Sequence, residues 1–447
     1  MMRRLLRSQP ERVRDLLVRR HTPGVVVERT RMNNDLMYQA SGLMLDRLPL
    51  EAVAEGYGTP VYVYSTASIR RQSTRLVQSL GTIGSLRYAV KANANPALLA
   101  LIFSMGIGAD TVSQGEIRAA LGAGCPADHI VFSGVGKTPD ELAFALDRGV
   151  FINAECEEEL TAIARLQAGT HVGIRVNPGV DAHTHQYMTT AMEENKFGIP
   201  IDAAPGAFRL AVNAGLVPDT ISCHIGSQIM SLEPYRKSLA RLLELRDSLM
   251  SDGFPVTTLD IGGGFGISYD EGADFPVEDL ATLLRRDVPQ GIKLWFEPGR
   301  YVVGHAGTLV TRVLYRKRYT RTFIVVDAAM NDLIRPALYQ ARHAILPVTV
   351  RDSQPIPCDV VGPVCESADC FARDVPIPLP DQGDLLAICD TGAYGWSMSS
   401  TYNSRSLLPE VLVDDGEPSL VRDRGGSETI PPAVEPGAGT VHWAGRS

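Results

Sequence analysis

The sequence predicts a closed barrel of eight β/α units followed by a mostly antiparallel β domain. Between residues 86 and 299, eight short runs of aliphatic or β-branched residues alternate with longer helical patterns. Past residue 307 the helical patterns give way to short strands separated by turn signals. Eight alternating units over this length are typical of a parallel (β/α)8 TIM barrel. The alternative is an open doubly wound sheet, whose glycine-rich loop normally follows the first strand, whereas the glycine run here follows the seventh.

The barrel strands are predicted at residues 86–90, 108–112, 130–133, 150–154, 172–176, 221–224, 257–261 and 292–296. The C-terminal ends of barrel strands carry the chemistry in this architecture, so we expect the residues at or just past these ends to line one rim. Those residues are polar or glycine: Lys91, Asp110 with Ser113, Gly134, Asn153 with Glu155, Arg175 with Asn177, His224 with Ser227, Gly262 to Gly264, and Glu297.

The β domain is predicted from strands at residues 308–313, 323–327, 345–350, 358–361, 385–389 and 410–413. The chain then divides into an N-terminal extension (1–31), a segment that joins the β domain (32–60), the barrel (61–307) and the β domain (308–424). Residues 425–447 are rich in Gly, Ser, Pro and Ala without periodicity, which predicts a disordered tail.

The composition narrows the class of partner. The 447 residues are 45% hydrophobic and 21% charged, with a net charge of -8, and such an acidic protein is not expected to bind nucleic acid or an anionic membrane. No apolar run is long enough to span a bilayer. The seven cysteines form no CxxC pair, which favours reduced thiols in the cytoplasm over disulfides or a metal site. A small molecule is therefore the expected partner.

The segment YAVKAN at residues 88–93 places Lys91 at the end of the first barrel strand. An ammonium at the mouth of an apolar barrel is partly desolvated, so its pKa is expected to fall and the neutral amine can attack a carbonyl. Lys91 is therefore a candidate for a Schiff base. The alternative is an ordinary surface lysine that caps a strand.

The segment DIGGGFG at residues 260–266 follows the seventh strand, and its consecutive glycines let backbone N–H groups converge on an anion. Barrels commonly hold a phosphate at the loops after strands seven and eight, which favours a phosphate site over an ordinary tight turn. Glu297 and Arg300, in the EPGR segment, bring a carboxylate and a guanidinium to the same place. His224 is either a core histidine or a ligand contact beside Ser227.

These segments, in this order, resemble those of the alanine-racemase-like, fold type III pyridoxal-phosphate enzymes, and within them the diaminopimelate decarboxylases. Each segment is weak alone, whereas eleven in sequence are specific. The resemblance covers residues 48 to 413 and includes YAVKAN, GADTVSQGE, IVFSGVGKT, IRVNP, HTHQYMTT with NKFGI, HIGSQ, DIGGGFG, EPGR, DAAMNDLIRPALY, GPVCES and DTGAYGWSMSS.

The resemblance implies pyridoxal 5'-phosphate as the cofactor, attached to Lys91. It places His224 against one face of the pyridine ring and Glu297 at the ring nitrogen. A carboxylate there keeps the nitrogen protonated, which makes the ring a strong electron sink and favours decarboxylation. The other residues that it assigns to the cofactor are Asp110, Arg175, Ser227, Gly263, Gly264, Gly299, Arg300 and Tyr394.

The resemblance also implies meso-2,6-diaminopimelate as the substrate, decarboxylated to L-lysine. This molecule carries a second ammonium and a second carboxylate, and arginine binds carboxylates bidentately. The residues expected to bind the far end of the substrate are Arg300, Arg335, Tyr339, Glu366 and Tyr394.

A homodimer with shared active sites is implied as well. Cys365 and Glu366, in GPVCES, are expected to complete the site of the partner chain, with Cys365 as the catalytic proton donor. From the residue alone, a buried small hydrophobe is the alternative for Cys365.

Two other functions stay open. A decarboxylase of the same fold could act on ornithine, lysine, arginine or carboxynorspermidine, although a plain amine end would not need both Arg300 and Arg335. A non-catalytic cofactor-binding homologue is the second alternative, and Lys91, Glu297 and Cys365 together argue against it. The chain departs from the family at residues 406–407, where Ser-Leu stands in place of Pro-Arg, which concerns packing or an interface more than chemistry.

Overall fold

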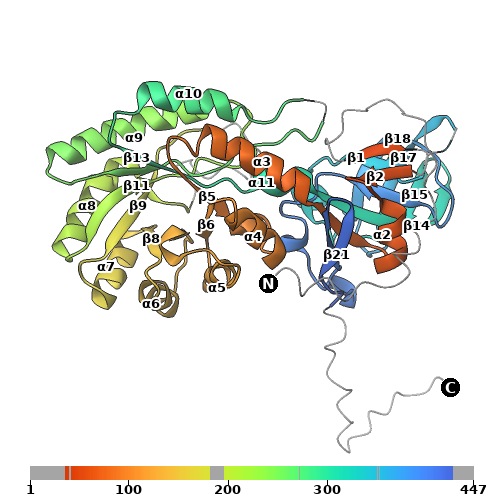
Figure 1. The fold of residues 1–447 in the computed structure, drawn as a ribbon, viewed down its shortest axis with the longest axis horizontal. Coiled ribbons are helices and arrows are strands. Elements are labelled where there is room, and N and C mark those ends of the chain that lie inside the picture. The colour runs from red at the N-terminus through yellow and green to blue at the C-terminus, as the bar shows by residue number, and fades with distance from the viewer. Residues whose placement is uncertain are drawn as a thin grey trace, which may run out of the picture.

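The computed structural model describes residues 36–39, 42–181, 196–270, 272–349, 351 and 353–425. Figure 1 shows a barrel with its surrounding helices at one end of the molecule and a β domain at the other. The predictions for the N-terminal extension, for the tail from residue 426 and for the HTHQYMTT segment lie outside the described residues. No helix in the described part combines the length and the apolar character needed to cross a membrane.

Eight parallel strands of the described chain form the barrel, which confirms the predicted fold. Each strand pairs with the next, and the last pairs with the first to close the ring. The sixth strand ends at Ser222 instead of the predicted residue 224, so His224 lies in the loop beyond it. The strands are β5 (Ser85–Ala89), β6 (Gly108–Thr111), β7 (Ile130–Phe132), β8 (Phe151–Ala154), β9 (His171–Asn177), β11 (Val217–Ser222), β12 (Thr258–Asp260) and β13 (Lys293–Phe296).

Helices connect the strands and surround the barrel (Figure 1). Polar caps begin α3, α4, α5 and α6. For example, the side chain of Asn95 accepts a hydrogen bond from the N–H of Ala97, and Thr138 and Glu141 form a reciprocal capping box. These contacts satisfy N–H groups that the first helical turn leaves unpaired. The helices are α3 (Thr66–Ser79), α4 (Pro96–Phe103), α5 (Gln114–Gly122), α6 (Pro139–Asp147), α7 (Glu157–Leu166), α8 (Ala204–Asn213), α9 (Glu233–Ser251), α10 (Val277–Asp287) and α11 (Arg300–Val303).

The strand register decides which side chains point into the barrel. Asn153, Ser222 and Asp260 come from three strands and join one another through hydrogen bonds of 3.1 to 3.2 Å, so their side chains point inward. Asp260 is the register partner of Trp295, and Ser222 is that of Arg175. Because paired positions share a face and a strand alternates faces, these two side chains also point inward. The upper barrel interior is therefore polar.

The β domain is mostly antiparallel, as predicted. Its long strand β14 (Gly307–Arg318) pairs with antiparallel neighbours on both sides, and the parallel pairs in the described part are β15 with β17 and β4 with β20. The other strands are β15 (Thr322–Val326), β16 (Ile345–Pro347), β17 (Pro355–Val361), β18 (Cys370–Pro378), β19 (Leu385–Ile388), β20 (Glu410–Asp414) and β21 (Glu417–Arg422), with the short helix α12 (Arg335–Tyr339) between β15 and β16.

Past residue 307, two strands of this domain, β18 and β21, were not predicted, and both lie at sheet edges. Pro376 and Pro378 make the sequence of β18 read as a loop, but an edge strand tolerates proline because one side of it needs no N–H donors. Residues 406–407, where the chain departs from the family, precede β20 and the edge strand β21. Leu407 forms a β-bridge with Gly425, the residue with which the predicted tail begins.

The segment before the barrel packs on the β domain. The small sheet of β1 (Leu36–Gln39), β2 (Gly42–Leu45) and β3 (Leu48–Pro49), with helix α2 (Leu50–Tyr57), shares an apolar cluster with residues of that domain. Strand β4 (Val61–Ser65) then pairs with β14 and β20. The predicted barrel boundary at residue 61 is therefore too early, because β4 belongs to the sheet of the β domain.

Candidate active site

Lys91 lies at the C-terminal rim of the barrel, in a single 3-10 turn directly after β5. Its Nζ is 2.9 Å from Oδ2 of Asp110, a residue of β6 that is fully buried. Ala89 and Asp110 are register partners on adjacent strands, so the two strand ends bring the ammonium and the carboxylate together. The structure thus confirms that Lys91 stands at the rim among polar groups.

The pKa of Lys91 lies above its ordinary value. Burial lowers this pKa, but the negative charge of Asp110, with contributions from Tyr394 and Glu297, raises it by more. The prediction that desolvation lowers the pKa of the amine is therefore wrong. It treated the barrel mouth as apolar, whereas carboxylates surround the lysine.

Three carboxyl groups are buried at or just past the ends of barrel strands: those of Asp110, Asp260 and Glu297. Asp260 accepts hydrogen bonds from Asn153 and from the backbone N–H of Gly262, at 3.1 and 3.0 Å. Burial, followed by the charges of Asp110 and Asp260, raises the pKa of Glu297 well above its ordinary value. The interior of the barrel at this level therefore holds more acid than base, and a cation would be stabilised there.

Arg87 is a buried cation that the sequence reasoning missed. It lies two residues before Ala89 on β5, so it shares the inward face, and its guanidinium carbon is 3.6 Å from the ring centroid of Trp295. Burial lowers the pKa of Arg87, while the charges of Asp260, Glu297 and Asp110 raise it. An arginine at an inward position of a predicted barrel strand is the signal that could have found it.

His224 stands in the loop after β11, next to the glycine run. The backbone N–H of Gly263 donates to its Nδ1 over 3.3 Å, so that nitrogen carries no proton. Burial, with the charges of Lys91 and Arg175, lowers the pKa of His224 well below its ordinary value. The imidazole is therefore a neutral, flat surface at the rim.

Glycine is required where the glycine run meets the loop after β13. A Cβ added to Gly263 would lie 1.9 Å from the carbonyl oxygen of Glu297, and Gly264 has a φ of +93°. On the other side, a Cβ added to Gly299 would lie 3.1 Å from that of Ala89. The predicted phosphate loops therefore lie against each other and against the strand end that carries Lys91.

Arg300 joins the phosphate side of the rim to the β domain. Its Nη2 donates to Oγ of Ser227 over 3.0 Å, and its Nη1 donates to the hydroxyl of Tyr269 over 2.8 Å. Its guanidinium carbon lies 4.9 Å from the ring centroid of Tyr394, and the backbone N–H of Tyr394 donates to the carbonyl oxygen of Ala92. The structure thus brings Ser227, Arg300 and Tyr394 together, as predicted, and adds Tyr269.

Arg335 begins helix α12 and is almost fully buried. Its Nη1 is 2.9 Å from Nε2 of His343, and its guanidinium carbon is 4.9 Å from the ring centroid of Tyr269. Tyr339 is half-buried at the end of the same helix, and its charge acts on the pKa of Arg300. Arg300, Arg335 and Tyr339 therefore lie in one region of the site.

Arg175 and Cys365 have other surroundings. The Nη1 of Arg175 is 2.5 Å from Oε1 of Glu155, which makes it part of an ion pair at the rim.

Cys365 and Glu366 are exposed, on the segment between β17 and β18, and Glu366 accepts a hydrogen bond from the hydroxyl of Tyr402. Cys365 is therefore no buried core thiol, and no described contact joins it to Lys91 within the chain.

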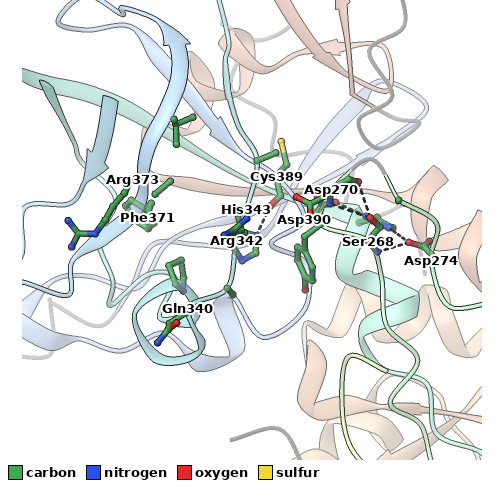
Figure 2. A pocket seen from close by; sticks show the side chains of 18 of the residues that line it. Ser268, Asp270, Asp274, Gln340, Arg342, His343, Phe371, Arg373, Cys389 and Asp390 are labelled. Carbon is green, nitrogen blue, oxygen red and sulfur yellow. Dashed lines mark hydrogen bonds and ion pairs between the residues drawn. The ribbon is translucent and has the colours of Figure 1, made fainter. Parts of the chain in front are cut away.

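A cavity of about 1350 Å³ lies between the barrel and the β domain. Tyr269 and His343 belong to its lining, and these residues also contact the two arginines. Figure 2 shows His343 beside Cys389 on one wall and Ser268, Asp270 and Asp274 on another. The arginine end of the site is therefore built from both domains.

Comparisons with known proteins agree with this geometry. Residues 66–304 match the family model of the pyridoxal-dependent decarboxylases, pyridoxal binding domain. The chain is 41% identical to a diaminopimelate decarboxylase of Aquifex aeolicus, covering 90% of this chain and 97% of the relative, and 44% identical to one of Pseudomonas aeruginosa, covering 87% and 95%. A crystal structure of the Helicobacter pylori diaminopimelate decarboxylase complexed with L-lysine superimposes with a TM-score of 0.81 at 39% identity, over 85% of this chain and 97% of the other.

Proposed function

The chain belongs to the pyridoxal-dependent decarboxylases, and within them to the family of the diaminopimelate decarboxylases, and we propose that it converts meso-2,6-diaminopimelate to L-lysine and CO2. The choice of this substrate rests on the two arginines Arg300 and Arg335. Both guanidiniums are buried, their Nε groups have no hydrogen-bond partner, and no carboxylate of the described residues pairs with either. Buried donors of this kind require an anion, and the second carboxylate of the substrate supplies it.

The residues of the barrel rim fit pyridoxal phosphate. The surplus of buried carboxyl groups at Asp110, Asp260 and Glu297 favours a cation, and a protonated pyridine nitrogen beside Glu297 would offset their repulsion. Oδ1 of Asp110 is buried without a hydrogen-bond partner, so it can accept from a bound group. The neutral ring of His224 offers a flat face for the pyridine ring.

The phosphate end has its own set of residues. Ser227, Gly263, Gly264, Gly299 and Arg300 would hold the phosphate, since a hydroxyl, a guanidinium and glycine backbone meet at these loops. Tyr394 lies against Arg300 and would add its hydroxyl. Arg175 is proposed to act from the rim, where Glu155 fixes its orientation.

Pyridoxal phosphate supplies an electron sink that stabilises the carbanion left when CO2 departs. The chain has to place three groups around it. Asp110 holds the amine of Lys91 through their 2.9 Å contact and favours its protonated form. Glu297 would hold the proton on the pyridine nitrogen, and Arg300 with Arg335 would hold the far carboxylate of the substrate.

The carbon that loses CO2 must then receive a proton, and we propose that Cys365 of a second copy of the chain delivers it. The exposed position of Cys365 and Glu366 supports this proposal, since a loop that completes a neighbouring site must reach out from its own chain. The working unit would then be a homodimer with two shared sites. Seven free thiols suit a reducing compartment, which supports a cytoplasmic location.

The test of the function is CO2 release by the purified protein with pyridoxal phosphate, across the isomers of diaminopimelate, L-lysine and L-ornithine. We expect turnover of the meso isomer and little or none of the two substrates that end in an amine. Preferred turnover of L-lysine or L-ornithine would assign the chain to another decarboxylase of the same fold. No turnover of any substrate would favour a non-catalytic homologue.

A further inference from the structure

Tyr269 contacts both arginines of the site, and His343 contacts Arg335 and Tyr269. Neither residue was among the predicted ones. Tyr269 belongs to the loop between β12 and α10, whereas His343 lies between α12 and β16 in the β domain. Their rings meet edge to face, with centroids 5.2 Å apart and planes at 79°. The pair therefore joins a barrel loop to the β domain at the arginine end of the site.

The hydrogen bonds of His343 fix its tautomer. Nδ1 is 2.8 Å from the carbonyl oxygen of Cys389, which can only accept, so Nδ1 carries the proton. Figure 2 shows this contact on the wall of the cavity. Nε2 faces Nη1 of Arg335, which can only donate, so Nε2 presents a lone pair. His343 is therefore a neutral acceptor for Arg335.

Electrostatics support the same assignment. Burial, followed by the positive charge of Arg335, lowers the pKa of His343 to about 3. The backbone carbonyl of Cys389 raises it by less, and Arg300 lowers it further. The acceptor nitrogen therefore stays unprotonated at neutral pH.

Tyr269 contacts both arginines with different parts of its side chain. The hydroxyl accepts from Nη1 of Arg300 over 2.8 Å. The ring lies 4.9 Å from the guanidinium carbon of Arg335, a distance at which the face of the ring attracts a cation. One side chain thus sets the spacing of the two guanidiniums, which would otherwise repel each other.

The choice of partners matters for charge. A carboxylate in place of His343 or Tyr269 would neutralise the arginines within the chain itself, whereas a neutral imidazole and a phenol hold them in place and leave their charge uncompensated. The unpartnered Nε groups of both arginines are consistent with an anion arriving from outside. Recognition of a carboxylate needs guanidiniums that are held in a fixed geometry and whose positive charge is not neutralised within the chain.

We propose that Tyr269 and His343 are positioning residues that hold Arg300 and Arg335 in one arrangement around the distal carboxylate of the substrate. The inference rests on the proposed function and adds two determinants of specificity to it. The two residues set the preference for an amino acid with a carboxylate at its far end. Neither residue is assigned a proton transfer or a direct contact with the cofactor.

The experiment compares Tyr269→Phe, His343→Leu and His343→Gln with the wild-type holoenzyme. Tyr269→Phe removes the acceptor for Nη1 of Arg300, and His343→Leu removes that for Nη1 of Arg335. Each should raise KM for meso-diaminopimelate about tenfold or more, because a hydrogen bond to a charged group is lost, with kcat changed less than about threefold. His343→Gln keeps an acceptor in reach of Arg335 and should restore most of the affinity.

A second measurement separates positioning from general damage. L-lysine and cadaverine differ by one carboxylate, so their ratio of competitive inhibition constants reports on the arginine pair. The variants should bring this ratio towards one, mainly by weakening lysine, whereas a destabilised fold would weaken both inhibitors alike. Tyr319→Phe and His129→Gln are matched controls, since both residues are exposed, and should leave the ratio unchanged.

An unchanged KM and inhibitor ratio in Tyr269→Phe and His343→Leu would overturn the inference. Equal losses in His343→Leu and His343→Gln would also overturn it for His343, because the acceptor would then be irrelevant. Failure of the proposed function looks different. In that case the wild-type protein itself would not release CO2 from meso-diaminopimelate.

Discussion

The two ends of the site have opposite charge. At the cofactor end, Lys91 lies near the buried carboxyl groups of Asp110 and Glu297, and Asp260 lies beside Glu297. At the far end, Arg300 and Arg335 are held by a phenol and an imidazole and have no carboxylate partner among the described residues. The first end stabilises a cation and the second an anion, so the polarity of the site alone orients a substrate with a carboxylate at its far end.

The two ends are also built differently. The acidic end comes from the ends of adjacent barrel strands, where register fixes which side chains meet. The arginine end combines a barrel loop and α11 with α12 and the segment after it in the β domain. Changes at the acidic end should therefore act on the chemical step, and changes at the arginine end on substrate affinity.

The largest effect is expected for Lys91→Ala. The amine binds the cofactor and takes part in proton transfer, so activity should fall by at least about 10⁴-fold and the absorbance of the lysine-bound cofactor should disappear. Lys317→Ala, a change of an exposed lysine on β14, is the control. Turnover like that of the wild type in Lys91→Ala would show that Lys91 takes no part in the reaction.

Glu297→Gln should retain the cofactor and lower kcat by about three orders of magnitude. The amide keeps the shape of the side chain but cannot hold a proton on the pyridine nitrogen, so the electron sink weakens. KM should change much less, since the arginine end is untouched. A steady-state comparison with absorbance of the bound cofactor checks this, and an unchanged kcat would mean that another group controls the ring nitrogen.

The comparison also shows what the sequence can and cannot predict. The eight barrel strands and the rim residues were predictable, because a polar residue at or just past the end of an apolar run, such as Lys91 after β5 or Glu297 after β13, is a local pattern. The contacts of Arg300 with Tyr269, of Tyr269 with His343 and of His343 with Arg335 depend on how two domains pack, which no local pattern encodes. The raised pKa of Lys91 was missed for a related reason, since Asp110 is next to it only after strand pairing.

A smaller effect tests whether a second chain completes the site. Lys91→Ala and Cys365→Ala chains should each be inactive alone. After subunit exchange in equal amounts, about half of the dimers are mixed, and each has one intact site if the sites are shared under two-fold symmetry, so activity should recover to about a quarter of wild type. Light scattering and mass spectrometry verify the exchange. No recovery among verified mixed dimers would place both groups of each site in one chain.

The smallest effect concerns two histidines that repeat the contrast between acidic and basic surroundings. His305 donates to Asp390 through Nδ1 over 2.6 Å and to Asp274 through Nε2 over 2.9 Å. Burial lowers the pKa of His305, but the two carboxylates raise it by more than burial lowers it, so that it reaches about 10. His343, beside Arg335, has its pKa lowered to about 3.

Linkage gives these shifts opposite signs in stability. The unfolded histidine has a pKa of about 6.5. The stabilisation from His305 is therefore fully present below pH 6.5 and is lost as the pH rises towards 10, whereas His343 costs stability as the pH falls from 6.5 towards 3. Each slope is at most about 1.4 kcal/mol per pH unit.

In thermal melts of the apoprotein, His305→Gln should lose more Tm at about pH 6 than at about pH 9. His343→Gln should gain Tm relative to wild type as the pH falls from about 6.5 to 5, and His129→Gln should do neither. Parallel curves for all three variants would mean that neither histidine is held in the charge state that its neighbours dictate.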